Sequence, residues 1–260
     1  MFTPFAFVKS AAAAGGPTLW TPAYITTLAW YDASNQSSVT LNGTDVSQIN
    51  DLSGNGYNAT QSTPSLQPAY TNTLNSLKVM TFDGTNKLDV PSVNFNNDKS
   101  VSLYAVSRKR STSGTYQVIA AFWKSSTNTA AMLAQMATGP NFWGSYTGNE
   151  DPADSALNTT DSYVLSLVAS TTDGVMSFWK TGTADGTDGD WSTTTVFSSG
   201  ALGNDQYGSA LNGDIAEIVF INQKDTTTER QKMEGYLAWK WGLQAGLPTG
   251  HPYKDAPPYV

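Results

Sequence analysis

The chain has 260 residues, of which 13% are charged and 12% aromatic, and its formal net charge at pH 7 is -7. This length suits one large all-β domain or two small ones. The lack of cysteine excludes disulfides, thiolate metal sites and cysteine nucleophiles. The acidic balance argues against nucleic-acid binding, and no run of about 18 apolar residues is present to span a membrane.

Residues 1–19 are predicted to form an N-terminal arm and linker. Phe2, Phe5 and Phe7 are apolar anchors on a segment too short to form its own core, and a spacer rich in alanine and glycine follows them. The nearby cation, Lys9, comes after the apolar stretch, an order that argues against a signal peptide. We expect the three phenylalanines to anchor the chain to a partner, with packing on its own domain as the alternative.

A series of short strands joined by polar turns follows the arm. Asn42-Gly43 and Asp173-Gly174 predict tight hairpin turns, and Asn50–Gln61 is a loop rich in turn-forming residues. The predicted strands are Leu28–Tyr31, Val39–Leu41, Val46–Ile49, Leu77–Phe82, Lys87–Val90, Ser100–Ser107, Gln117–Trp123, Ala130–Met136, Phe142–Tyr146, Tyr163–Ala169, Val175–Lys180, Thr193–Phe197 and Ile215–Ile221.

The last predicted strand, Ile215–Ile221, is apolar on nearly both faces, which favours a place inside a two-layer structure. A period of two puts Ile215, Glu217, Val219 and Ile221 on one face and the even-numbered residues on the other.

A helix is predicted over residues 227–242, where Thr226 and Glu229 form a capping box at its start. Apolar residues occupy more than one side of this helix, so we expect it to be wedged between two surfaces. Lys240 lies in the middle of the apolar stripe. Gly235 costs about 1 kcal/mol relative to Ala in a helix interior, which indicates a close approach between the helix backbone and a neighbour.

Together these elements predict an all-β fold. It is a two-sheet antiparallel jelly-roll sandwich with one C-terminal α-helix and an extended N-terminal arm. The predicted division is an arm and linker at residues 1–19, the sandwich with its closing helix at residues 20–246, and a proline-rich tail at residues 247–260.

Several stretches together resemble the laminin-G-like, concanavalin-A-like jelly-roll domains. They read AWYDASN, DLSGNGYNATQ, LKVMTFDGTNKL, GDIAEIVFIN and ERQKMEGYLAWKWGL, the last continuing into LPTGHPYKDAPP. The resemblance implies the jelly-roll fold, and its closing helix with a His-Pro-Tyr tail is typical of versions in phage virion proteins and bacterial surface proteins. The fold serves lectins, adhesion modules, glycoside hydrolases and structural proteins alike.

The carboxylates do not form the pattern of a glycoside hydrolase, which needs two acids facing each other across a cleft. Glu229 and Glu234 fall on the predicted helix, Glu150 lies in a loop, and Glu217 is alone in its strand. The sequence therefore predicts no catalytic residue and no enzyme.

The best metal candidate is a glycine-rich loop that contains Asp185, Asp188 and Asp190. Calcium prefers six to eight oxygen ligands, although Asp-Gly pairs are also what a plain turn requires. The single histidine, His251, lacks further soft ligands for zinc and is expected to pack in the tail or lie on the surface. We expect no cofactor, with calcium at this loop as the alternative.

Aromatic residues in or beside polar loops are candidates for stacking on a sugar face: Trp143, Tyr146 and Trp191. They could equally cover the core or make subunit contacts. The tryptophans within strands are predicted to be core residues: Trp30, Trp123 and Trp179.

From these features we expect a non-catalytic virion structural or attachment protein, such as a capsid decoration, head fibre or tail-associated protein. It would be an oligomer on the virion surface, anchored by its arm to other virion proteins or to copies of itself. The alternative is a carbohydrate-binding adhesin or lectin module that binds cell-surface glycans and is extracellular or on the cell surface. A glycoside hydrolase acting on polysaccharides is the second alternative.

Overall fold

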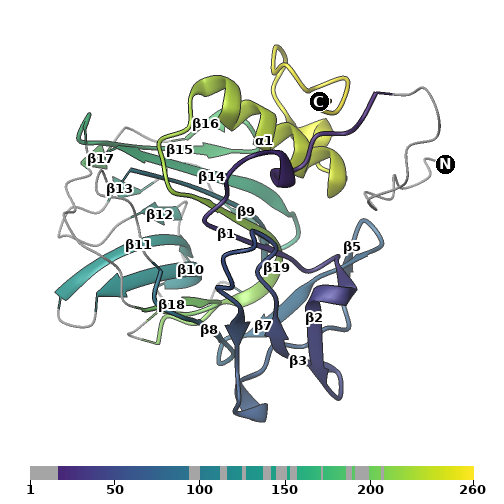
Figure 1. Cartoon of the computed structure of the whole chain (residues 1–260), viewed down its shortest axis with the longest axis vertical. Coiled ribbons are helices and arrows are strands. Elements are labelled where there is room, and N and C mark those ends of the chain that lie inside the picture. The colour runs from purple at the N-terminus through teal and green to yellow at the C-terminus, as the bar shows by residue number, and fades with distance from the viewer. Residues whose placement is uncertain are drawn as a thin grey trace.

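Figure 1 shows a computed structural model of the chain, which describes residues 17–93, 100–111, 116–124, 127–136, 142–144, 151–152, 157–170, 172–185, 189–190, 199–205 and 208–260. In this part of the chain two antiparallel sheets pack together, and a single α-helix covers the outer face of one of them. The predicted all-β sandwich with a C-terminal helix is confirmed. The predicted anchors Phe2, Phe5 and Phe7 and the predicted strand at residues 193–197 lie outside the described residues.

The first sheet carries the helix. Its strands run in the order β1 (Ala29–Asp32), β19 (Asn212–Ile221), β9 (Val101–Lys109), β14 (Tyr163–Ser170), β15 (Val175–Lys180) and β16 (Thr183–Ala184). β7 (Met80–Asp83) also pairs with β19, and β17 (Gly189–Asp190) pairs with β15. The predicted hairpin between β14 and β15 is confirmed, and Gly174 in its turn has a φ of 68°.

The second sheet runs in the order β13 (Asp151–Pro152), β12 (Phe142–Gly144), β11 (Thr127–Met136), β10 (Tyr116–Lys124), β18 (Ser199–Leu202), β8 (Leu88–Val90), β4 (Ala59–Thr60), β3 (Asp45–Ile49) and β2 (Val39–Asn42). The turn between β2 and β3 contains Gly43 with a φ of 66°, as the Asn-Gly pair predicts. β5 (Thr73–Leu74) and β6 (Leu77–Lys78) form a separate hairpin. Short 3-10 turns lie at Pro22–Tyr24, Gln36–Ser38, Pro64–Leu66 and Gln244–Gly246.

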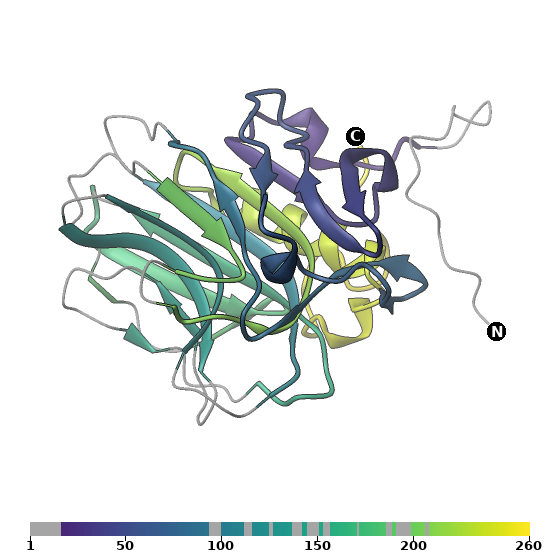
Figure 2. The same ribbon diagram turned by 90° about the horizontal axis from the view of Figure 1, so that it is seen from below.

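The two sheets lie face to face (Figure 2). Apolar side chains from both sheets fill the space between them. Leu103 and Ala105 of β9 and Ile218 of β19 enter this core from the first sheet. Phe122 of β10 meets Phe220 of β19 with ring centroids 4.4 Å apart and ring planes at 84°, an edge-to-face contact. Such contacts between the sheets hold the two layers together.

A β-bulge in β19 changes which residues face the helix. The pairing with β9 shifts between Ile215 and Glu217, so Ala216 is an extra residue in the strand. Ile215 therefore faces the sandwich core together with Ile218, while Ala216 and Glu217 both lie on the helix side with Val219. The strict alternation predicted for this strand is wrong at Ile215 and Ala216, because the extra residue reverses the face of the residues that precede Glu217.

The helix α1 (Thr227–Lys240) begins at the predicted capping box. The Thr226 side chain accepts a hydrogen bond from the Glu229 amide, and the Glu229 carboxylate accepts one from the Thr226 amide at 2.7 Å. Trp20 packs against Tyr236 on the sheet side, where a second apolar cluster fills the gap between α1 and the sheet.

The tail covers the other side of α1, so the helix is wedged between two surfaces as predicted (Figure 1). The Trp239 indole donates to the Tyr253 carbonyl at 2.8 Å. A Cβ on Gly235 would lie 2.5 Å from the Cβ of Tyr253, which confirms the close approach expected there. The end of the tail returns to the start of the described chain, where Leu19 bridges Tyr259. The α-helix is neither long nor apolar enough to cross a membrane, so the part of the chain that the structure describes contains no membrane-spanning helix.

Candidate functional site

A pocket of about 360 Å³ lies where the start of α1 crosses β14 and β15. Its floor comes from β15, in which Met176 and Phe178 face the sandwich core and the alternate residues face outward. Val175, Ser177 and Trp179 therefore line the pocket from one strand face. Trp179 is half-buried and faces the pocket, so its predicted place in the core is wrong.

The wall beside Trp179 is the side chain of Arg230, whose guanidinium lies over the indole ring at 4.0 Å from its centroid. Arg230 Nη1 donates to both carboxylate oxygens of Glu234 at 2.7 Å, one helical turn further on. Ser166 on β14 donates to Glu234 Oε1 at 3.0 Å. Because Glu234 is fixed in this way, Arg230 and the aromatic ring beneath it are held in one orientation.

His251 completes the support of Glu234 from the tail. Its side chain is 1% exposed, and Nε2 lies 3.3 Å from Glu234 Oε2. The Tyr253 amide donates to Nδ1 at 3.2 Å, so the ring proton belongs on Nε2, which donates to Glu234. Packing in the tail, one of the two places expected for His251, is the one that the structure shows.

Asp225 forms the end of the pocket nearest the helix start. Tyr104 donates to its Oδ2 at 2.6 Å, and the Asp225 amide donates to Ser102 Oγ at 2.9 Å. Burial raises the pKa of Asp225 to about 6, although the hydrogen bond from Tyr104 opposes this shift. A carboxyl with this pKa can exchange a proton near neutral pH.

The other charged group at the pocket is Lys224, which forms an ion pair with Asp173 from the turn between β14 and β15. A hydrogen bond from Lys224 lowers the pKa of Asp173. The pocket therefore offers an aromatic surface, hydroxyls, one carboxyl and two cations, and each cation already contacts a carboxylate. These groups can form hydrogen bonds to an uncharged polar ligand such as a sugar, and the aromatic ring can stack on it.

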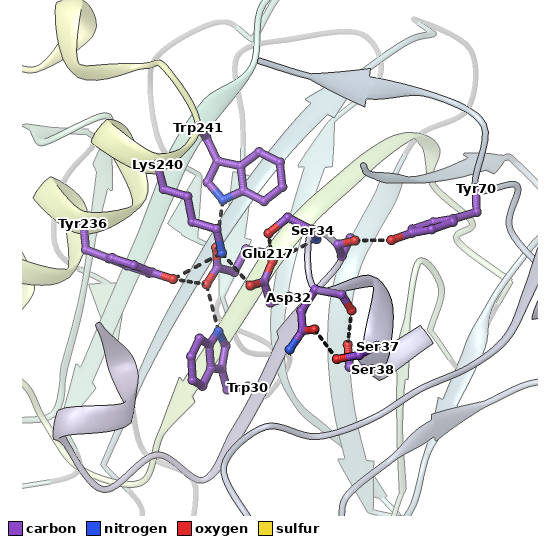
Figure 3. A network of polar contacts seen from close by, with 12 residues as sticks. Trp30, Asp32, Ser34, Ser37, Ser38, Tyr70, Glu217, Tyr236, Lys240 and Trp241 are labelled. Atoms are coloured by element: carbon purple, nitrogen blue, oxygen red, sulfur yellow. Dashed lines mark hydrogen bonds and ion pairs between the residues drawn. The ribbon is translucent and has the colours of Figure 1, made fainter. Parts of the chain in front are cut away.

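A second polar cluster, centred on Glu217, lies beneath the C-terminal half of α1 (Figure 3). Trp30 and Tyr236 donate to Glu217 Oε1, both at 2.8 Å. Trp241 and Lys240 donate to Oε2 at 2.8 and 2.7 Å. Each oxygen of this carboxylate thus accepts two hydrogen bonds from groups that belong to β1, to α1 or to the end of α1.

Lys240 joins Glu217 to a second acid, Asp32 at the end of β1, whose Oδ2 lies 2.6 Å from Nζ. Burial raises the pKa of Glu217 even though Lys240 opposes it. Burial also disfavours the charge on Lys240, but the two carboxylates outweigh it and raise the pKa of the amine. Glu217 is fully buried and Asp32 is 7% exposed, so this acid pair does not open onto the surface.

Of the three aromatic residues predicted to bind sugar, one lies within the described part of the chain. Trp143 lies in β12 of the second sheet, where its backbone pairs with Ala134 and Pro152. Tyr146 and Trp191 lie outside the described residues. Of the three aromatic candidates the structure thus describes only the backbone of Trp143, which lies on the second sheet, whereas the pocket lies on the first. The sugar-binding role of the three residues stays a prediction.

The predicted calcium loop is described only in part. Asp185 is 5% exposed, and its amide donates to the Phe178 carbonyl at 2.9 Å. Asp190 belongs to β17, where its backbone pairs with Val175, and Asp188 lies outside the described residues. No group of three or more potential ligands is found within the described ranges, so calcium binding here stays a prediction.

The sequence analysis identified neither the pocket nor the Glu217 cluster, because the residues that meet at each of them are far apart in the chain. Asp32 and Lys240 are 208 positions apart, and Glu217 has no partner within reach on its own strand. A signal was nevertheless present, since a lysine in the apolar stripe of a buried helix requires a carboxylate partner. For Trp179, the polar Ser177 two residues earlier marks the outward face of the strand.

No protein-family model matches the sequence, and no curated protein matches it either. Solved structures do match. The chain is similar to Trypanosoma rangeli sialidase in complex with the inhibitor DANA, with a TM-score of 0.58 and 15% identity over 83% of this chain and 34% of that one. It is also similar to an arabinofuranosidase complexed with arabinofuranosyl-alpha-1,2-xylobiose, with a TM-score of 0.55 and 14% identity over 83% of this chain and 59% of that one.

A third match covers a separate domain almost completely. It is domain 4 of AbnA, a GH43 extracellular arabinanase from Geobacillus stearothermophilus, in complex with arabinotriose. The TM-score is 0.53 and the identity 18%, over 78% of this chain and 96% of that domain. By contrast, the chain spans about a third of the length of the sialidase. At these identities the matches establish a shared β-sandwich fold.

These matches correct the functional prediction. The structures reported above come from glycosidases, and none of them is a virion protein. The prediction of a non-catalytic virion attachment protein is therefore wrong, as is the prediction that excluded an enzyme, and the carbohydrate-related alternative agrees better with the matches. Nothing in the comparisons links the chain to a phage.

Proposed function

We propose that this chain is a carbohydrate-binding β-sandwich domain of a protein that acts on or adheres to polysaccharides. The observation that carries the proposal is the match over 96% of an arabinanase domain that was solved with arabinotriose bound. The resemblance of the sequence to laminin-G-like, concanavalin-A-like lectin domains supports the same reading.

The pocket between α1 and β15 is the binding site that the geometry supports best. Trp179 supplies an aromatic ring, and Arg230 and Asp225 supply hydrogen-bonding groups around it. Glu234 and Tyr104 fix the positions of these two polar side chains, and such preorganisation lowers the entropic cost of binding. Its volume of about 360 Å³ is at the lower end of the usual range for ligand pockets, which suits one or two sugar units.

The test is to screen the full chain on a glycan array and then to measure affinity for the best oligosaccharide by calorimetry. We expect Trp179→Ala to weaken binding at least about tenfold, because a stacking ring at the centre of a site contributes over about 1.4 kcal/mol. Trp239→Ala is the matched control, since Trp239 is also half-buried but contacts the tail. Binding should then stay within about twofold.

Two other outcomes are informative. If glycan binding survives Trp179→Ala but is lost in Trp143→Ala or Trp191→Ala, the site lies among the loop aromatics predicted from the sequence. If no glycan binds at concentrations up to the millimolar range, the proposed function is wrong.

A second candidate function is glycoside hydrolysis, which the glycosidases among the matched structures favour. Asp225 has the pKa of about 6 that suits a general acid, and Asp173 is a second carboxyl paired to the adjacent Lys224. The test is to incubate the bound polysaccharide with the protein and to measure new reducing ends. Turnover that is lost in Asp225→Asn while binding remains would support hydrolysis, and the absence of turnover in the unmodified protein would exclude it.

A further inference from the structure

The buried cluster under α1 holds a lysine between two carboxylates. Lys240 Nζ lies 2.6 Å from Asp32 Oδ2 and 2.7 Å from Glu217 Oε2. The side chains of Lys240, Asp32 and Glu217 are 2%, 9% and 0% exposed. The rings of Trp241 and Tyr236 lie 5.3 and 5.5 Å from Nζ and enclose it together with Trp30 (Figure 3).

We propose that Lys240 and Asp32 condense to an intramolecular isopeptide bond between Nζ and Cγ, with Glu217 transferring the protons. An amine can attack a carboxyl group when it is neutral, when it is held in contact with that group and when water is excluded. The geometry of this cluster provides the contact and the exclusion of water. Glu217, whose pKa is raised by burial, is the carboxylate beside Nζ that can take a proton from the ammonium.

The two acids differ in a way that identifies Asp32 as the electrophile. Both oxygens of Glu217 are held by two donors each, and three of these four donors are the rigid side chains of Trp30, Tyr236 and Trp241. Glu217 is thereby fixed as an acceptor next to Nζ. The two oxygens of Asp32 have different partners. Oδ2 accepts a hydrogen bond from Lys240 Nζ, whereas Oδ1 accepts one from the Ser34 amide.

Ser34 holds the Asp32 oxygen that does not contact Lys240. Its amide and its hydroxyl donate to Asp32 Oδ1 at 2.9 and 2.6 Å. Two donors aimed at one carboxyl oxygen are the arrangement that stabilises negative charge developing on that oxygen during nucleophilic attack. Oδ1 would therefore become the amide oxygen, and Oδ2 would leave.

The reaction balances without any further reactant. Starting from the ammonium and two carboxylates, Lys240 Nζ loses two of its three protons, one after the other, through Glu217. Its lone pair forms the bond to Asp32 Cγ, the Cγ–Oδ2 bond breaks, and Oδ2 takes up both protons and leaves as water. The product is one amide N–H, one water molecule and Glu217 as the carboxylate that it was at the start.

The bond would connect β1 to α1 across 208 positions of the chain. β1 pairs with β19, on which Glu217 lies. The bond would therefore join β1 covalently to the helix that packs on the first sheet. It would also replace the Lys240–Asp32 ion pair by a neutral amide, while Glu217 keeps its hydrogen bonds from Trp30, Tyr236 and Trp241. This bond would prevent α1 and β1 from separating even when the rest of the fold opens.

The test is the mass of the purified, unfolded full chain. We expect it to be lower than the sequence mass by one water molecule, with Lys240→Arg as the reference, since a guanidinium cannot form this amide. Trypsin should not cleave after a modified Lys240, so the digest should contain residues 10–78 joined to residues 233–254. Asp32→Ala and Glu217→Gln should both show the full mass.

Three outcomes would overturn the proposal. One is the full mass for the unmodified protein, which would leave an ordinary buried ion pair. The second is a water loss that maps to another part of the chain. The third, a linked peptide that forms to the same extent in Glu217→Gln, would exclude Glu217 from the reaction. The measurement on the unmodified protein decides the first two outcomes even if a variant fails to fold.

Discussion

Asp225 is an acid whose surroundings favour its neutral form. It is 5% exposed, and burial raises its pKa from 3.8 to about 6. Because the folded state then holds its proton more tightly than the unfolded state does, protonation of Asp225 stabilises the fold. This contribution is fully present below pH 3.8 and is lost as the pH rises through about 6, opposite to the behaviour of a carboxylate in an ion pair.

We therefore expect the free energy of unfolding to contain a term from Asp225 that falls by up to about 3 kcal/mol as the pH rises from about 4 to about 6. Asp225→Asn should remove this term, since the amide carries no charge and still accepts a hydrogen bond from Tyr104. The measurement is urea unfolding of both proteins across this pH range. Parallel curves for the two proteins would show that the carboxyl does not titrate in this window.

At the scale of single residues, the sequence shows which residues are unusual for their position, but not which residues they contact. Lys240 in an apolar stripe and Gly235 in a helix interior are both visible as exceptions to helix composition. A close neighbour of Gly235 could be inferred because glycine weakens a helix interior and the missing Cβ leaves room for an approaching chain. Asp32 could not be inferred as the partner of Lys240, since no local rule connects residues so far apart in the chain.

Among the elements, α1 depends on contacts on both of its sides. A Cβ on Gly235 would lie 2.5 Å from Tyr253 Cβ and 2.7 Å from its Cγ, closer than real Cβ contacts allow. Gly235→Ala would gain about 1 kcal/mol of helix propensity but would push the tail away. We expect a net loss of about 1–3 kcal/mol in the free energy of unfolding, the usual cost of overpacking.

Chemical denaturation of a double-mutant cycle would measure this contact directly. Tyr253→Gly removes the opposing Cβ, so Gly235→Ala should no longer destabilise the protein in that background. Thr228→Ala is a control on the exposed side of the same helix and should change stability by less than about 0.5 kcal/mol. An unchanged cost of Gly235→Ala in both backgrounds would show that the tail is not responsible.

The elements that could be predicted are those with local signals. Hairpin turns follow from Asn-Gly and Asp-Gly pairs, and the helix start follows from Thr226 and Glu229. The bulge at Ala216 has no such signal, because it arises from the pairing of β19 with β9. The assignment of β10 to the sheet opposite β9 is likewise set by pairing between distant segments.

For the whole molecule, the fold class could be predicted from the number of short strands, and the function could not. The same sandwich serves binding domains and enzymes alike, so function depends on the residues of a particular site. The pocket is built from β15, the start of α1 and the supporting tail residue His251, which are separated in the chain. Only the folded structure shows that these segments meet.

The net charge of the chain and the ion pairs of the pocket limit the class of glycan that the domain can bind. The chain carries a net charge of -7, and the two cations of the pocket, Arg230 and Lys224, already contact Glu234 and Asp173. An acidic sugar would therefore meet a repulsive field and would have to compete with these carboxylates. A neutral sugar meets no such cost, since stacking and hydroxyl contacts do not depend on the net charge.

We accordingly expect a neutral oligosaccharide to bind at least about tenfold more tightly at low salt than the same oligosaccharide with a terminal sialic acid. The difference should shrink at high salt, because screening weakens the repulsion while the stacking on Trp179 is unaffected. Calorimetric titrations of the matched pair at two salt concentrations measure both effects. Tighter binding of the acidic member at low salt would mean that Arg230 or Lys224 leaves its carboxylate to hold the ligand, and would assign the pocket to acidic glycans.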